Sequence, residues 1–243
     1  MVLRTRSLGE ADRIVTALTK SHGKIRAVAK GVRKTSSHFG ARVEPFMVVD
    51  IQWAKGRTLD IIQQVELLGA YGAEMARDYD RFAAASSMVE TADSLTDHDA
   101  PSSHYALLVA ALRSLSRGEH PADLTLGSYL LRALAQSGWA PSVSACAQTG
   151  EPGPHRHFVA SLGGVVSSRV APPGSPILRE GVAQLLEALM QGAWDQAESS
   201  TVTQREQALA LIQAYTQTQL ERSVRSFRQV ATDVTFHREE AAR

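Results

Sequence analysis

The chain has 243 residues, of which 44% are hydrophobic and 21% are charged, and these are ordinary proportions for a folded protein. This length has room for one large domain or two small ones. The single cysteine, Cys146, excludes an internal disulfide, and no apolar run approaches the length of a membrane-spanning helix. Residues 1–6 lack the apolar segment of a secretory signal, so a cytoplasmic protein is the simplest expectation.

The net charge of +1 conceals a strong asymmetry along the chain. Residues 1–57 contain 12 Lys and Arg against 4 Asp and Glu, which gives +8, whereas the remainder contains 14 against 21, which gives −7. A basic segment attached to an acidic body indicates a polyanionic partner, most often a nucleic acid.

The first 68 residues have the two-residue period of β-strands. Strands are expected over residues 1–6, 13–20, 23–31 and 43–53, followed by one marked by Leu59, Ile61 and Val65. A short Gly-containing link, residues 54–57, joins the last two. Five short strands without intervening helices suit a small barrel such as an OB-fold, and an SH3-like barrel is the structural alternative.

The strand over residues 23–31 presents the basic charge on one side. Ile25, Ala27 and Ala29 lie on its apolar face, and the opposite face holds Lys24, Arg26, Val28 and Lys30. Side chains on that face are about 7 Å apart, a spacing comparable to that of phosphates along an extended single strand. An ordinary solvated strand face is the alternative interpretation.

After Tyr71 the apolar residues follow a helical period. Helices are expected over 78–96, from Pro101, from Pro121 to Gly138, and over 178–191 and 203–223, with a polar tail after Phe236. Residues 139–176, rich in Pro, Gly and Ser, interrupt this bundle as an irregular insert. The expected fold class is therefore α+β, with a strand domain at 1–70 and a helical domain at 71–243.

Several segments resemble the RecO family of bacterial recombination mediators, in the form found in actinobacteria. The resemblance includes Leu8–Thr16, His22–Arg33, Phe39–Phe46, Gly138–Pro141 and Gly153–Arg156, and it extends in order over nearly the whole chain. It implies an N-terminal OB-fold, a helical bundle and a small zinc-finger-like insert.

The same resemblance implies a function in recombinational DNA repair. Members of this family bind single- and double-stranded DNA and anneal complementary strands. They act with RecR and RecF to load RecA onto strands coated by single-strand-binding protein, whose acidic tail is a further expected partner. None of these activities requires the protein to make or break a covalent bond.

By position, the resemblance makes Arg26 and Lys30 the residues expected to contact phosphate. Arg33 and Lys34 extend this set, and Lys24 and Arg13 complete the predicted DNA-binding residues. Phe39, Phe46 and Trp53 are the aromatic residues available for base stacking in this part of the chain. For Trp53, packing in the core is favoured over base stacking. For Phe46 and Phe39, core packing and base stacking remain equal alternatives.

The insert departs from the family pattern at its metal ligands. Many relatives have four cysteines there, but the corresponding positions are Cys146, Thr149, Ser167 and Val170. We therefore expect no zinc and no other cofactor. The insert is expected either to keep its shape through Phe158, Val159, Leu162 and Val165 or to be partly disordered. The first strand also begins abruptly at Met1, which leaves closure of the barrel open.

The sequence contains none of the phosphate-binding loops or metalloprotease motifs that would indicate an enzyme. Two functions of different classes remain. One is a DNA-binding, strand-annealing mediator. The other is mainly an adaptor for RecR and the acidic tail of single-strand-binding protein, with DNA contact secondary. It would need an apolar groove with a basic rim, which Arg113, Arg117 and Arg132 beside Leu residues could supply.

Overall fold

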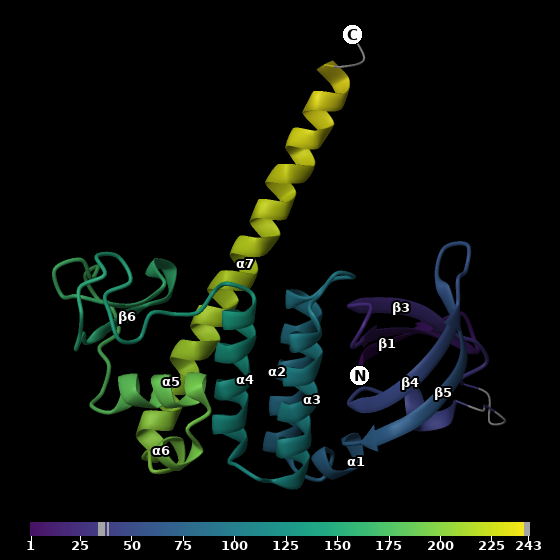
Figure 1. The fold of residues 1–243 in the computed structure, drawn as a ribbon, viewed down its shortest axis with the longest axis horizontal. Helices are drawn as coiled ribbons and strands as arrows, with labels where there is room; N and C mark the ends of the chain where they lie inside the picture. Colours follow the sequence, from purple (N-terminus) through teal and green to yellow (C-terminus); the bar gives the residue numbers. More distant parts are fainter. Residues whose placement is uncertain (34–36, 38, 241–243) are drawn as a thin grey trace.

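The strands, the helices and the insert follow one another across the molecule. The computed structural model describes residues 1–33, 37 and 39–240, with side chains described as far as residue 221. Figure 1 shows the strand domain at one end, helices α2, α3 and α4 in the middle, and the insert with α5 and α6 at the other end. The long helix α7 runs past the insert and projects beyond the body (Figure 1).

Five strands form one sheet in the N-terminal domain. They are β1 (Val2–Leu8), β2 (Asp12–Leu18), β3 (Lys24–Ala29), β4 (Met47–Ala54) and β5 (Asp60–Ala70), with a short 3-10 helix, η1, at Gly40–Val43. The strand order is β1-β2-β3-β5-β4, and β3 and β5 are the parallel neighbours. This order is typical of an OB-fold and confirms the predicted α+β class.

The two edge strands, β1 and β4, approach each other without forming a ladder. One backbone hydrogen bond links them, in which the N–H of Phe46, just before β4, donates to the carbonyl of Val2 at 3.2 Å. The interior is filled by small and branched apolar side chains, including Val15, Ala27 and Val49. The sheet therefore has its own core, as the two-residue period predicted.

The helical part begins directly after β5. Its helices are α1 (Gly72–Met75), α2 (Tyr79–Leu95), α3 (Ser102–Arg117), α4 (Ala122–Gln136), α5 (Val182–Gln191), α6 (Trp194–Glu198) and α7 (Val202–Glu240). Asp78 caps α2, because its carboxylate accepts hydrogen bonds from the N–H groups of Asp80 and Arg81. Among the described residues, no helix combines the length and apolarity needed to cross a bilayer.

Two helical features differ from the sequence expectation. Helices α1 and α6 were not predicted, because four and five residues are too few to establish a period. Helix α7 continues to Glu240, well past residue 223, and the predicted polar tail after Phe236 is largely helical backbone. Its Gln, Arg, Ala and Glu residues are good helix formers. A prediction based on the apolar period alone therefore ends this helix too early.

The insert is more regular than expected. It contains β6 (His157–Val159) and β7 (Gly164–Val166), paired antiparallel around the short 3-10 helix η2 (Ala160–Leu162). Phe158 and Val165 are buried, and the Phe158 ring meets Tyr215 of α7 edge to face at 6.0 Å between centroids. The first of the two expectations, an insert shaped by apolar packing, is therefore confirmed for Phe158 and Val165.

Candidate nucleic-acid interface

Strand β3 exposes two of the predicted cations. Arg26 lies in the middle of the strand and Lys30 directly after its end, and both side chains are exposed. Ala27 and Ala29, on the opposite face, are completely buried in the barrel. The apolar side of β3 thus holds the strand in place, while Arg26 and Lys30 extend into solvent.

The pairing register brings a further arginine to this face. Arg6 pairs with Ile14 of β2, and Ile14 pairs with Val28 of β3. Directly paired residues point to the same side of a sheet, so Arg6, exposed on β1, shares the face of Arg26. The sequence analysis missed Arg6 because its orientation depends on the register between strands.

Two loops continue the positive charge around the barrel. Arg33 is exposed, and its backbone N–H is fixed to the carbonyl of Ala11 at 3.0 Å. Lys55 and Arg57 are exposed in the link before β5, whose first residue, Asp60, pairs with Ala27 of β3. Lys34 lies outside the described residues. We call Arg6, Arg26, Lys30 and Arg33 the basic surface.

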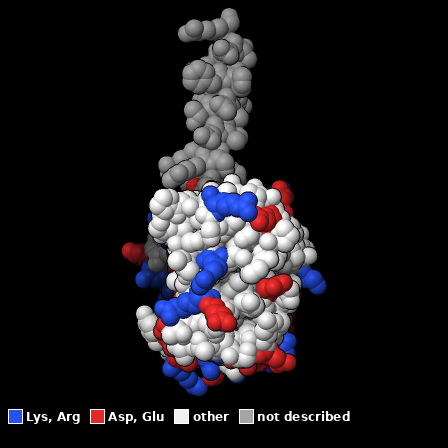
Figure 2. Space-filling view, turned by 90° about the vertical axis from the view of Figure 1, so that its left-hand side faces the viewer, with Lys and Arg blue, Asp and Glu red and all other residues white. Residues whose placement is uncertain are grey.

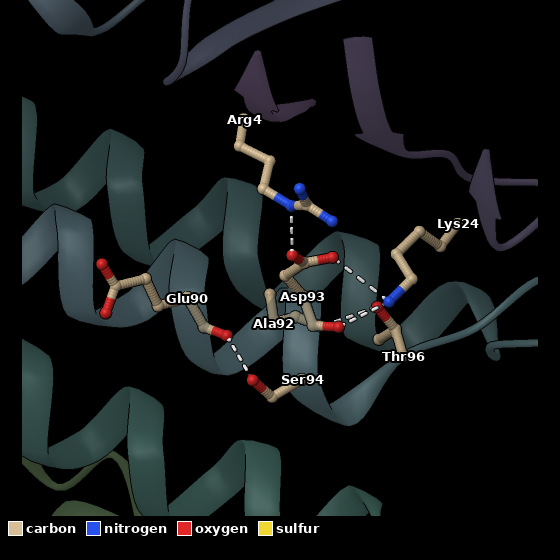
Figure 3. A network of polar contacts seen from close by, with 7 residues as sticks. All are labelled: Arg4, Lys24, Glu90, Ala92, Asp93, Ser94 and Thr96. Carbon is tan, nitrogen blue, oxygen red and sulfur yellow. Dashed lines mark hydrogen bonds and ion pairs between the residues drawn. The ribbon is translucent and has the colours of Figure 1, made fainter. Parts of the chain in front are cut away.

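Lys24 makes structural contacts that set it apart from the basic surface. Its ammonium group lies 3.2 Å from the Asp93 carboxylate of α2 and donates to the Asp93 carbonyl at 2.5 Å. Arg4 of β1 donates to the other oxygen of the same carboxylate at 2.6 Å. Figure 3 shows Asp93 between these two cations, one from each of two strands. Lys24 therefore joins the barrel to the helices.

The two cations also change the acidity of Asp93. Partial burial by itself would raise the pKa of this carboxyl, but the hydrogen bonds and positive charges of Arg4 and Lys24 outweigh it. The pKa of Asp93 is consequently lowered from its ordinary value. The carboxylate is thus ionised, and it neutralises part of the charge that composition alone assigned to the barrel.

Arg13 also has an acidic partner. Its guanidinium forms an ion pair with Glu44, which precedes β4, and both side chains are partly buried. Val28 is buried as well, with 8% of its surface exposed. The prediction of a solvent-exposed face is therefore right for Arg26 and Lys30 and wrong for Lys24 and Val28. We leave Lys24 and Arg13 out of the basic surface.

The three aromatic residues of the barrel have different surroundings. Phe46 is buried and meets Phe82 of α2 edge to face at 5.7 Å, and Phe39 packs against the barrel core. Trp53 is partly exposed and belongs to neither apolar core, so the prediction that it packs in the core is wrong. Trp53 is the last residue but one of β4, at the end of the strand, where the paired strand β5 has one extra residue, Gln63.

The opposite end of the molecule has a different character. Figure 2 views the side with the insert, α5 and α6, and its surface is mostly uncharged, with Lys and Arg interspersed with Asp and Glu. On this view of the described residues, positive charge is not separated from negative charge. The barrel end, with its exposed cations, is therefore more complementary in charge to a polyanion than this end.

Comparisons with known proteins agree with this architecture. The family model described as "Recombination protein O N terminal" matches residues 1–71, and "Recombination protein O C terminal" matches residues 76–228. The chain belongs to the RecO family. Similar proteins named "DNA repair protein RecO" come from Thermobifida fusca (45% identity over 95% of this chain and 96% of the relative) and Cutibacterium acnes (45%, over 93% and 94%). The protein of that name from Streptomyces griseus is 44% identical, over 95% and 96%.

Within this RecO chain, the four positions that correspond to zinc ligands supply one thiol. The Cys146 side chain is buried, and it accepts a hydrogen bond from the N–H of Ser167 at 3.4 Å. A hydrogen bond with Thr149, followed by backbone N–H groups, lowers the pKa of Cys146 to about 6 against the effect of burial. Among the described residues, no three His, Cys, Asp or Glu side chains gather as metal ligands would. These donors do not fit zinc, and a zinc-free insert remains a prediction.

Proposed function

We propose that this protein is a DNA-binding recombination mediator in recombinational DNA repair. The observation that carries the proposal is the basic surface, which presents four exposed cations on an OB-fold of the RecO family. We infer that it binds single- and double-stranded DNA, anneals complementary strands and helps RecR to load RecA.

The physical basis of this function is the neutralisation of phosphate charge. Each Lys or Arg that contacts a phosphate releases condensed counterions from the DNA, which favours binding without reading the base sequence. Two complementary strands repel each other less once their phosphates are partly neutralised, so binding energy alone can promote annealing. We accordingly propose that the protein is not an enzyme and that it acts in the cytoplasm, at the nucleoid.

The partner proteins are inferred from membership of the RecO family. RecR, and also RecF and RecA, are the expected partners at the site of repair. The acidic tail of single-strand-binding protein is expected as the contact that brings the mediator to coated strands.

An adaptor function is the second candidate, and a cleft between α3, α4 and α6 supports it. The cleft has a volume of about 490 Å³ and is lined by Leu107, Tyr129, Arg132 and Trp194 among other residues. Trp194 stacks on His120 at 3.8 Å between ring centroids. The lining combines apolar side chains with polar ones such as Ser103, Glu119 and Gln136, and the exposed Arg132 is the group that suits an acidic peptide. Arg117, in contrast, pairs with Glu119 at 3.5 Å, outside this role.

Annealing of complementary oligonucleotides without any nucleotide cofactor tests the proposal. We expect the wild-type protein to accelerate annealing and the double variant Arg26→Ala/Lys30→Ala to do so much less. The variant Arg113→Ala/Arg169→Ala removes the same charge from exposed positions on α3 and the insert, and it serves as the control. Equal annealing by the two variants would contradict a role for the basic surface, and ATP-dependent turnover or DNA cleavage would contradict the mediator function.

A further inference from the structure

A cleft at the mouth of the barrel lies apart from the basic surface. It has a volume of about 390 Å³ and opens beside the turn between β2 and β3. Its lining includes Lys20 and His22 from this turn, Asp50 and Trp53 from β4, and Tyr105 from α3. The cleft is thus formed by the strand domain and by one helix that packs next to it.

Aromatic rings are concentrated in this cleft. His22 and Trp53 meet edge to face, with 5.3 Å between ring centroids and an interplanar angle of 86°. Trp53 and Tyr105 are both partly exposed there, but Tyr105 also packs against the helical core, so Trp53 is the ring that lies outside both cores. The mouth of the barrel therefore offers rings on which a planar ligand can stack.

The charged groups of the cleft are complementary to a nucleotide. Lys20 and Asp50 are both exposed, and neither has an ion-pair partner among the residues that the structure describes. Burial raises the pKa of Tyr105, and the neighbouring Tyr71 and Asp50 add to this shift, so its hydroxyl is a neutral donor beside a carboxylate. A phosphate fits at Lys20, while the Asp50 carboxylate repels phosphate and accepts N–H donors.

The cleft is also within reach of a strand that contacts the basic surface. His22 precedes Arg26 by four residues, which limits their separation along the chain to about 14 Å. A single strand that crosses Arg26 needs only a few nucleotides to place a base at Trp53. One ligand can therefore occupy the basic surface and the cleft together.

We propose that this cleft binds one unpaired base of single-stranded DNA, stacked on Trp53, with its phosphate at Lys20 and its exocyclic amino group donating to Asp50. The proposal rests on the proposed function and adds a base-binding site to it. Cytosine, adenine and guanine have an exocyclic amino group and thymine has none. The cleft therefore favours oligo(dC) over oligo(dT), which phosphate contacts alone do not distinguish.

Fluorine NMR of protein labelled with 5-fluorotryptophan tests the site in the folded wild-type protein. The chain has three tryptophans, and the resonance that Trp53→Phe removes identifies Trp53. We expect saturating oligo(dC) to shift the Trp53 resonance by more than those of Trp139 and Trp194. A Trp53 resonance that does not move at saturation would overturn the proposal.

Affinities of the two oligonucleotides separate the cleft from the basic surface. Trp53→Ala should weaken binding by about 10-fold, Trp53→Phe by much less, and Asp50→Ala should abolish the preference for oligo(dC). Arg26→Ala should weaken both oligonucleotides equally. If Arg26→Ala weakens binding and Trp53→Ala does not, the base site is refuted and the proposed function stands. If neither variant weakens binding, the proposed function fails as well.

Discussion

The contacts of individual residues determine which cations of the barrel are available to the proposed DNA ligand. Arg4 and Lys24 hold Asp93 of α2, and Arg13 holds Glu44, whereas Arg6, Arg26, Lys30 and Arg33 are exposed. Composition counts all of these residues equally. The contacts divide them into cations that stabilise the fold and cations that extend into solvent.

Asp93→Asn should lower the free energy of unfolding by about 1–3 kcal/mol at pH 7, because the charge-assisted hydrogen bond from Arg4 and the ion pair with Lys24 are weakened. The pKa of Asp93 is lowered in the folded state, so its stabilisation is present above about pH 4, the unfolded value, and is lost as pH falls through the folded value. Urea unfolding over this pH range measures the effect, with exposed Asp99→Asn as the control. A difference between wild type and Asp93→Asn that stays constant down to pH 2 would contradict the ion pair.

Gly23 fixes how closely the turn between β2 and β3 approaches the helices. It has φ = +55°, and an added Cβ would lie 2.2 Å from the His98 carbonyl oxygen and 2.5 Å from that of Asp97. Only glycine fits this close approach, which also allows the N–H of Lys24 to donate to the Asp97 carbonyl at 2.7 Å.

Gly23→Ala should therefore destabilise the protein by clearly more than Gly9→Ala. Gly9 has φ = +61° but no atoms within 4 Å of an added Cβ, so its variant should cost only the conformational penalty of about 1–2 kcal/mol. Thermal unfolding of both variants measures the difference. Equal melting temperatures would show that the turn can withdraw from the helices without cost.

At the scale of secondary structure, elements with a clear period could be predicted from the sequence. Very short elements, and contacts between residues far apart in the sequence, could not. Strand β3 could be predicted because Ile25, Ala27 and Ala29 alternate with polar residues. The ion pair between Lys24 and Asp93 could not, since 69 residues separate the two in the sequence. Strands β6 and β7, with three residues each, are too short to show a period.

The same limit applies to the candidate site. The exposure of Arg26 and Lys30 followed from alternation within one strand, but Arg6 required the register between β1, β2 and β3. Trp53 occupies an odd-numbered position, like the core residues of β4, and nevertheless lies outside both cores, at the end of the strand. Alternation within one strand predicts which face a residue occupies, but it does not predict whether the core extends as far as the end of that strand.

The insert should fold without metal. Cys146 is its one thiol, and Phe158 and Val165 fix it against the rest of the molecule by packing. Metal analysis of dialysed protein should find much less than one equivalent of zinc, and a strong chelator should leave the melting temperature unchanged. One equivalent of zinc that survives dialysis would refute this prediction.

At the scale of the whole molecule, the charge asymmetry of the sequence becomes a spatial one. The basic surface lies on the barrel, at one end, and the insert at the other end presents mixed charges on a mostly uncharged face (Figures 1 and 2). The apolar core of the helices includes Met1, Leu3 and Leu18 from the barrel, so the two parts pack directly against each other. DNA bound at the barrel, as we propose, would leave the helical end accessible to protein partners.

The salt dependence of DNA binding tests the central claim, that exposed cations of the barrel contact phosphates. The slope of log K against log salt concentration should be measured for one single-stranded oligonucleotide, with the wild-type protein, Arg26→Ala/Lys30→Ala and the control Arg113→Ala/Arg169→Ala. Each lost phosphate contact should reduce the slope by about 0.7, so the first variant should differ from wild type by about 1.4 and the control by nearly zero. Identical slopes for wild type and Arg26→Ala/Lys30→Ala would contradict the claim.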